Sequence, residues 1–123
     1  AFLNKKKKVE LWGTGKPLRD FLYVDDLAEG ILLLTKKYNS SEIINLGSGT
    51  EISIKKLAVL ISKIIGFKGI IIYNNKYPDG TPRKILDITK VKKLGWRPKH
   101  TLEKGLQKTV EWYIENHKTA TRK

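Results

Sequence analysis

The stretch VELWGTGKPLRDFLYVDDLAEGI, residues 9–31, decides the fold class, because its pattern changes from strand to loop to strand to helix. Its first residues, 9–12, alternate apolar and polar side chains as a short β-strand does. Gly13, Gly15 and Pro17 then interrupt the alternation. We therefore expect a loop directly after the first strand.

A helix is predicted after this loop. DFLYV, residues 20–24, has an extended pattern, and Asp25 and Asp26 follow it as N-cap and first-turn carboxylates. We expect the helix to run to about Tyr38, with an apolar stripe formed by Leu27, Ile31 and Leu34.

Strands and helices continue to alternate along the chain. The apolar segment 42–47 predicts a buried strand, which the turn residues GSGT close. Ser53 is the expected N-cap of a helix with one apolar face, and Gly66 stands where a left-handed residue is favoured at its end. Residues 70–73 predict another strand before the polar loop 74–84.

Two helices complete the expected order. Thr89 is predicted to cap a short helical turn that ends at Gly95. Thr101 is predicted to cap a helix to about His117, with inward positions Leu102, Leu106, Val110 and Tyr113. The sequence shows no linker and no repeat, and it predicts one α/β domain over residues 1–123 in which short strands alternate with helices.

The composition is that of a folded globular protein, with 40% hydrophobic and 30% charged residues among 123. The absence of cysteine excludes disulfides and thiolate metal ligands, and His100 and His117 form no metal-binding pattern, so we expect two surface histidines and no metal. No apolar run reaches the roughly 18 residues of a membrane span, and the first residues lack a signal-peptide pattern. We expect a cytoplasmic protein with no membrane partner.

The net charge of +13 favours anionic partners. Of the 25 cationic residues 21 are Lys, and they are spread over the whole chain without a basic helix or an aromatic stripe. We therefore favour a solvated basic surface, in which Lys5–Lys8 lie on a leader before the first strand, over nucleic-acid binding. A small basic nucleic-acid-binding domain is the alternative function.

The glycine pairs do not match the nucleotide-binding fingerprints. Leu18 in GTGKPL and Ile52 in GSGTEI stand where G-x-G-x-x-G requires its third glycine. Around Lys16, a Walker loop would require glycine in place of Glu10 and Ser or Thr in place of Pro17. We therefore expect no cofactor-binding residues in this chain.

Two loops carry side chains that suit a nucleotide diphosphate. Arg and Lys bind phosphate oxygens, a carboxylate accepts from ribose hydroxyls, and an indole packs on a base or a sugar. Taken singly, each residue also fits a commoner role as a turn aspartate, a solvated cation or a core tryptophan. The residues are Trp12, Lys16 and Arg19 in the first loop, and Asp79, Arg83 and Lys84 in PDGTPRK of the second.

The chain from Val9 to Asn116 resembles the carboxyl-terminal part of the GDP-L-fucose synthases, within the extended short-chain dehydrogenase/reductase family of nucleotide-sugar epimerases. RDFLYVDD alone would indicate the broader epimerase/dehydratase family, whereas WGTGKPLRDF together with PDGTPRK indicates the GDP-L-fucose synthases. The resembling segments are VELWGTGKPLRDFLYVDDLAEGI, INLGSGTEISIKKLA, YPDGTPRKILDITKVKKLGW, and TLEKGL followed by TVEWYIEN.

The resemblance implies a role for each residue that matches the motifs. Trp12 and Arg19 would contact the GDP-sugar, and Asp79 and Lys84 would contact its ribose and diphosphate. Two further roles follow in the same way: electrostatic support for Lys16 and Arg83, and helix capping for Asp25 and Asp26.

The resemblance also implies what this sequence lacks. Family members carry an amino-terminal NADP-binding half with a catalytic serine, a Tyr-x-x-x-Lys pair and an epimerising cysteine, none of which occurs in these 123 residues. The full-length enzyme would use NADPH to convert GDP-4-keto-6-deoxy-mannose to GDP-L-fucose by 3,5-epimerisation and 4-reduction. We expect the chain alone to bind the GDP-sugar, to hold no catalytic residue, to be inactive, and not to form the family's homodimer.

Overall fold

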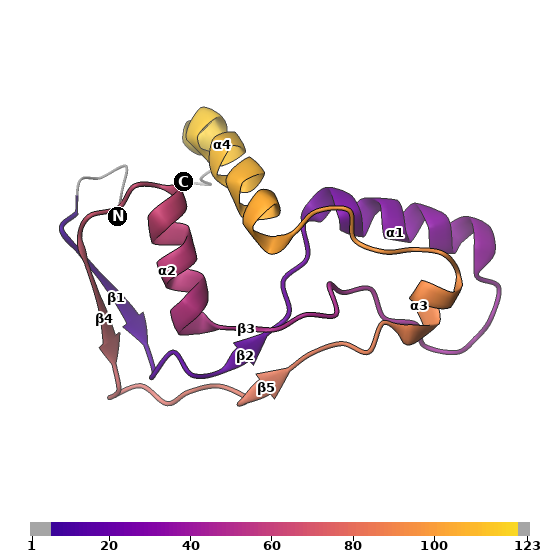
Figure 1. The fold of residues 1–123 in the computed structure, drawn as a ribbon, viewed down its shortest axis with the longest axis horizontal. Helices are drawn as coiled ribbons and strands as arrows, with labels where there is room; N and C mark the ends of the chain where they lie inside the picture. Colours follow the sequence, from indigo (N-terminus) through magenta and orange to yellow (C-terminus); the bar gives the residue numbers. More distant parts are fainter. Residues whose placement is uncertain (1–5, 121–123) are drawn as a thin grey trace.

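The computed structural model describes residues 6–120. The chain has a β-β-α-β-α-β-β-α-α order, and its elements lie in an elongated row with β1 and β4 at one end and α1 and α3 at the other (Figure 1). The bounds are β1 Lys8–Trp12, β2 Leu18–Arg19, α1 Val24–Lys37, β3 Ile52–Ser53, α2 Ile54–Ile64, β4 Ile70–Asn74, β5 Arg83–Lys84, α3 Thr89–Lys93 and α4 Leu102–Ala120. The predicted alternation of helices and short strands, an α/β fold class, is confirmed.

The strands form two small sheets. β1 pairs with β4 in parallel, from Lys8 opposite Ile70 to Trp12 opposite Asn74. β2 is the central strand of a second sheet in which it is antiparallel to β3 and parallel to β5. β1 and β2 follow each other in the chain, as do β4 and β5, so two loops run from the first sheet to the second (Figure 1).

The helix caps follow local rules that the sequence makes visible. Ser53 accepts a hydrogen bond from the backbone N–H of Lys56 at 3.2 Å, and Thr101 accepts one from Lys104 at 3.3 Å. Gly66 has the positive φ of 63° that a helix end favours. The predicted caps of α2 and α4 are thus confirmed.

The cap of α3 differs from the prediction. The N–H of Thr89 donates to Oδ1 of Asp87 at 2.8 Å, so Asp87 performs the capping that we assigned to Thr89. An aspartate two residues ahead closes the same short turn, and the pattern alone does not distinguish the two residues.

The core lies at the α1–α3 end of the molecule. Ile88, Val91 and Trp96 are buried, and Leu22, Leu33, Leu34, Ile44 and Leu46 pack against them. The accessible surface of the chain is 9517 Å². A compact 14.1 kDa monomer exposes about 6,700 Å². The chain therefore exposes more surface than a compact monomer of its mass.

Segment 42–47 is not a strand, contrary to the sequence prediction. Ile44 and Leu46 pack on the core, whereas Ile43 is 83% exposed. The segment has no strand partner in the described part of the chain, and a strand requires one to satisfy its backbone groups. Segment 20–24 is likewise not a strand, because the observed strand β2 ends at Arg19.

The expected apolar stripe of α1 does not face the core along its length. Leu27 and Ile31 are 37% and 49% exposed, and only Leu34 of the predicted stripe packs on the core. Asp26 and Gly30 are the buried residues of this helix. On α4, Tyr113 is also exposed at 44%, although it was predicted to face inward. Tertiary contacts therefore bury a face of α1 that contains Asp26 and Gly30, and not its most apolar face.

Asp26 is buried because it binds His100. Its carboxylate accepts the backbone N–H of His100 at 3.0 Å and lies 2.9 Å from Nδ1 of the same residue. Neither Asp25 nor Asp26 caps α1, since the N-cap residue is Tyr23 and no side chain caps the helix. The expectation that His100 is a surface residue is also wrong, because only 24% of its side chain is exposed.

Burial by itself would raise the pKa of Asp26, but the hydrogen bonds from His100 and the backbone of Lys99 outweigh it and lower the pKa below 3.8. The stabilisation from the ionised carboxylate is therefore present above pH 3.8 and is lost as the pH falls through the lowered folded-state pKa. We expect Asp26→Asn to unfold more easily at neutral pH, by roughly 1.5 to 3 kcal/mol, and to lose less stability below pH ~4 than wild type. Urea unfolding between neutral and acidic pH measures both effects.

Asp25→Asn is the matched control for this prediction, since it removes the same charge from an exposed neighbouring position. We expect it to change the free energy of unfolding by no more than about 0.5 kcal/mol. Equal acid sensitivity in wild type and Asp26→Asn would contradict the stabilising role of the Asp26–His100 pair.

Candidate functional site

The two loops that run between the sheets lie side by side and form the candidate site. Residues 13–17 connect β1 to β2, and residues 75–82 connect β4 to β5. Because β1 pairs with β4 and β2 pairs with β5, both ends of the two loops are held in register. We call residues 12–19 and 74–84 the loop pair. All four predicted substrate-binding residues lie in it.

Asp79 joins the two loops. Its Oδ1 accepts the backbone N–H of Thr14 at 2.8 Å, and its Oδ2 accepts the hydroxyl of Thr14 at 2.5 Å. These hydrogen bonds, together with the charge of Lys16, lower the pKa of Asp79 despite some loss of hydration. Asp79 is therefore an ionised carboxylate with a structural contact.

Arg19 makes a second link between the loops. Its Nη1 donates to the carbonyl oxygens of Leu18 and Thr81, each at 2.7 Å. No described residue accepts a hydrogen bond from its Nε or Nη2. A guanidinium carries five N–H donors, so Arg19 can hold the loop and still present donors to a ligand.

Arg19 and Lys84 lie directly opposite each other on the parallel strands β2 and β5. Paired residues of neighbouring strands project from the same face of a sheet, so the two cationic side chains leave the sheet on one side. Neither forms an ion pair with an acidic residue of the described chain. Arg83, in contrast, binds Glu51 at 2.7 Å, so the electrostatic support that we expected from it is partly offset.

Trp12 ends β1 and is 69% exposed, so the reading of this residue as a core tryptophan is wrong. Its ring stacks on Tyr77 of the second loop, with ring centroids 4.4 Å apart and an angle of 17° between the planes. Sequence reasoning missed Tyr77, because a single aromatic residue in a polar loop carries no signal of its partner. Thr14 was missed as well, because a threonine in a loop carries no signal of its carboxylate partner 65 positions away.

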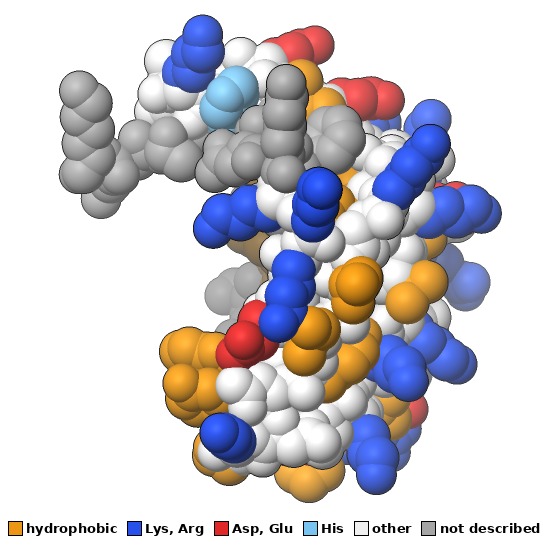
Figure 2. Space-filling model, turned by 90° about the vertical axis from the view of Figure 1, so that its left-hand side faces the viewer, with side chains coloured by type: hydrophobic (Ala, Val, Ile, Leu, Met, Phe, Trp, Pro, Cys, Tyr) orange, Lys and Arg blue, Asp and Glu red, His pale blue; other side chains and the backbone are white. Residues whose placement is uncertain are grey.

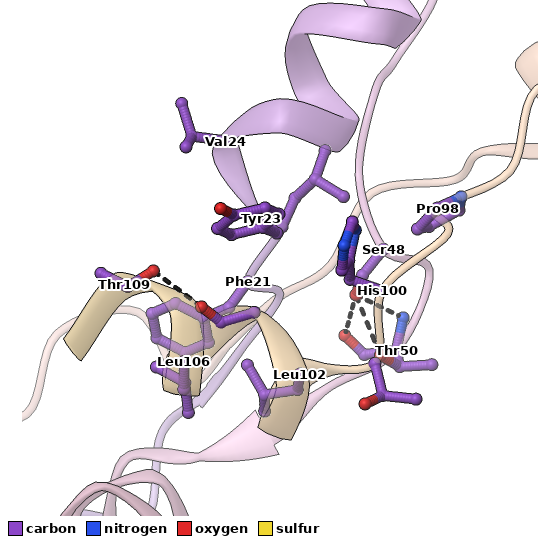
Figure 3. Close-up of a pocket in the computed structure, with 13 residues that line it drawn as sticks. Phe21, Tyr23, Val24, Ser48, Thr50, Pro98, His100, Leu102, Leu106 and Thr109 are labelled. Atoms are coloured by element: carbon purple, nitrogen blue, oxygen red, sulfur yellow. Dashed lines mark hydrogen bonds between the residues drawn. The ribbon is translucent and has the colours of Figure 1, made fainter. Parts of the chain in front are cut away.

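A cavity of about 560 Å³ lies elsewhere, between the start of α1, the start of α4 and the turn at residues 47–50. Figure 3 shows Phe21, Leu102 and Leu106 on one side of it and His100 on the other. None of Trp12, Arg19, Asp79 and Lys84 lines it. We place the candidate site at the loop pair, because the two loops carry the stacked Trp12 and Tyr77 and the paired Arg19 and Lys84, whereas the cavity walls are mainly apolar.

The side chain of Asp20 occupies the turn at residues 47–50, at the edge of this cavity. Asp20 accepts the N–H of Ser48 at 2.9 Å and the N–H of Gly49 at 3.1 Å, and it also accepts the hydroxyl of Ser48. A side chain at Gly49 would meet Ile88. The backbone donors of this turn are thus already used, and the turn does not fit a dinucleotide pyrophosphate.

Comparison with known proteins identifies similar chains. Residues 1–47 match the model of the NAD dependent epimerase/dehydratase family. A probable GDP-L-fucose synthase 1 of Oryza sativa is 48% identical over 94% of this chain and 35% of its own length.

Solved structures agree with these matches. A GDP-L-fucose synthetase from Naegleria fowleri bound to NADP is similar with a TM-score of 0.87 at 31% identity, over 94% of this chain and 37% of its own. The UDP-glucose 4-epimerase of Thermotoga maritima in complex with UDP-glucose gives a TM-score of 0.80 at 34% identity, over 89% and 36%. The chain thus spans little more than a third of the length of the relatives it matches. The predicted fold class, an α/β portion of an extended short-chain dehydrogenase/reductase, agrees with these similarities, and the substrate-binding role of this portion stays a prediction.

The link between the loops gives a testable prediction at Gly13. This residue has a φ of 82°, and a Cβ there would overlap Oδ1 of Asp79. Gly95 has a similar φ of 91° but open space around it, so it is a matched control. We expect Gly95→Ala to cost about 1 kcal/mol for the backbone conformation, and Gly13→Ala at least about 1 kcal/mol more for the clash.

Urea unfolding measures the two costs, and the amide resonance of Thr14 reports whether its hydrogen bond to Asp79 persists. Equal destabilisation by the two substitutions, with the Thr14 resonance unchanged, would contradict the structural role of the link.

Proposed function

We propose that this chain forms the GDP-sugar-binding part of a GDP-L-fucose synthase. The premise is the similarity of 94% of the chain to 35% of a relative with that name. The observation that carries the proposal is the juxtaposition of Arg19 and Lys84 on one face of a sheet without an acidic partner among the described residues. Two cations in register on one face of a sheet offer hydrogen-bond donors and positive charge to the oxygens of a diphosphate.

Trp12 and Asp79 complete the proposed site. The exposed indole of Trp12, at the start of the same loop that leads to Arg19, offers an apolar surface. Asp79 already accepts two hydrogen bonds from Thr14, but each carboxylate oxygen has a second lone pair for a ribose hydroxyl. We propose that the lowered pKa of Asp79 keeps it an acceptor at physiological pH.

The proposed reaction of the whole enzyme is the conversion of GDP-4-keto-6-deoxy-mannose to GDP-L-fucose with NADPH. NADP is bound in the similar Naegleria fowleri structure. The glycine pairs of this chain lack the fingerprint spacing, and Asp20 already accepts the N–H groups of Ser48 and Gly49, which supports the proposal that this chain does not hold the cofactor. We therefore propose that this chain binds substrate without turning it over.

The remaining expectations stay predictions. They are the single domain over residues 1–123, the cytoplasmic location, the lack of a membrane partner and the absence of the family's homodimer. Among residues 6–120, no helix is long and apolar enough to cross a bilayer.

The alternative of a nucleic-acid-binding domain receives no support. Figure 2 shows Lys and Arg side chains scattered over one face, with apolar side chains between them. The expected solvated leader is also shorter than predicted, since Lys8 belongs to β1 and pairs with Ile70. Lys5 lies outside the described residues.

Substrate binding is tested by titrating the 123-residue chain with GDP-mannose. We expect a dissociation constant of ~0.1 to 1 mM, because few charge-assisted contacts are available. Lys84→Ala removes one phosphate contact and should weaken binding by roughly 1 to 3 kcal/mol, and so should Arg19→Ala. Chemical-shift titration followed at Trp12, Arg19, Asp79 and Lys84 measures both.

Lys63→Ala is the matched control, because it removes the same charge from an exposed position on α2. It should leave GDP-mannose binding unchanged. No shift at the loop pair at millimolar GDP-mannose would contradict the proposal. RNA binding that collapses when Lys5–Lys8 are neutralised, without detectable GDP-mannose binding, would favour the nucleic-acid alternative.

Catalysis is tested separately. Hydride transfer needs a bound cofactor and a proton donor in line with the sugar, so the chain alone should neither bind NADPH nor consume it. An absorbance assay with NADPH and GDP-4-keto-6-deoxy-mannose measures consumption. A rate above the blank with pure protein would overturn the proposal that this chain is inactive alone.

A further inference from the structure

The stacked rings of Trp12 and Tyr77 form an exposed aromatic pair within the loop pair. Their centroids are 4.4 Å apart, their planes differ by 17°, and the residues are 69% and 43% exposed. The hydrophobic core, by contrast, contains Ile88, Val91 and Trp96 near α3. The aromatic pair is thus separate from the core, although aromatic residues usually bury most of their surface.

Tyr77 is held on both sides by hydrogen bonds of the loop pair. Its N–H donates to the carbonyl of Asn74 at 3.3 Å, and the same carbonyl accepts the N–H of Gly13 at 3.0 Å. The Asn74 side chain donates to Glu10 at 2.7 Å, which ties the end of β4 to β1. Two residues after Tyr77, Asp79 binds Thr14. The ring is therefore fixed against Trp12 by contacts on both strands.

We propose that Tyr77 is a positioning residue for the GDP-sugar: it covers one face of the Trp12 indole, fixes the orientation of that ring, and leaves the opposite face to stack on a flat, weakly polar face of the ligand. This inference rests on the proposed function and adds a residue to it. A fixed ring loses less conformational freedom on binding than a mobile exposed one, so the pair strengthens binding without Tyr77 touching the ligand.

The ligand offers two such faces, the guanine base and the C–H face of the hexose. Both are flat enough to stack on an indole. GDP contains only the first and GDP-mannose contains both, so the two nucleotides distinguish them. A Tyr77 effect on both ligands assigns the base, and an effect on GDP-mannose alone assigns the hexose.

The test compares Tyr77→Ala, Tyr77→Leu and Tyr77→Phe with wild type. Loss of the stacked ring should weaken GDP-mannose binding about 3- to 10-fold in the Ala and Leu variants, whereas Phe keeps the ring and should bind within about 2-fold of wild type. Tyr113→Ala is the matched control, since Tyr113 is 44% exposed on α4 outside the loop pair. It should bind as wild type does.

Nuclear magnetic resonance supplies the readout that separates positioning from folding. The indole N–H resonance of Trp12, assigned with Trp12→Phe, should move in the Ala and Leu variants and stay in place in Tyr77→Phe. The amide of Thr14 should keep its resonance in Tyr77→Leu, which preserves apolar volume in the loop. Calorimetric titration with GDP and GDP-mannose gives the affinities.

The possible failures are distinguishable. If wild type binds GDP-mannose and the Leu variant binds it equally well, the inference about Tyr77 is wrong and the proposed function stands. If Tyr77→Phe weakens binding as much as Tyr77→Ala, the hydroxyl acts and the stacking role is overturned. If wild type binds neither nucleotide, the proposed function itself is contradicted, and this inference with it.

Discussion

The carboxylate of Asp79 makes the contact on which the candidate site depends. It binds both the backbone and the hydroxyl of Thr14, 65 positions away in the chain. Gly13, with its positive φ and no side chain, permits this approach. Besides this contact, the loops are linked by the hydrogen bond from Arg19 to Thr81 and by the stacking of Trp12 on Tyr77, so loss of the Asp79 contact would remove one of three links.

The loop pair also places two cations in register, Arg19 on β2 and Lys84 on β5. Elsewhere in the described chain some cations bind a carboxylate, as Arg83 does with Glu51 and Lys90 with Glu42. Arg19 and Lys84 instead lie next to each other without such a partner. This register is the arrangement on which the proposed binding of a diphosphate rests.

Much of the remaining surface is apolar. Ile43, Ile70 and Leu32 are among the exposed large side chains, and the accessible surface of 9517 Å² exceeds that expected for a compact chain of this size. The small core at the α1–α3 end therefore leaves the loop pair dependent on local hydrogen bonds. That dependence makes single residues such as Thr14 and Tyr77 more important for the geometry of the site than their exposure indicates.

The sequence by itself determined the features that local rules govern. Ser53 and Thr101 cap their helices and Gly66 follows the end of α2, because capping depends on neighbouring residues. The positions of the cations in the two loops could also be read directly from the sequence. Tertiary structure alone decided the unpaired state of segment 42–47, the buried pairing of Asp26 with His100, and the stacking of Tyr77 on Trp12. Each of these depends on a partner distant in the chain, and a pattern of near neighbours contains no record of such a partner.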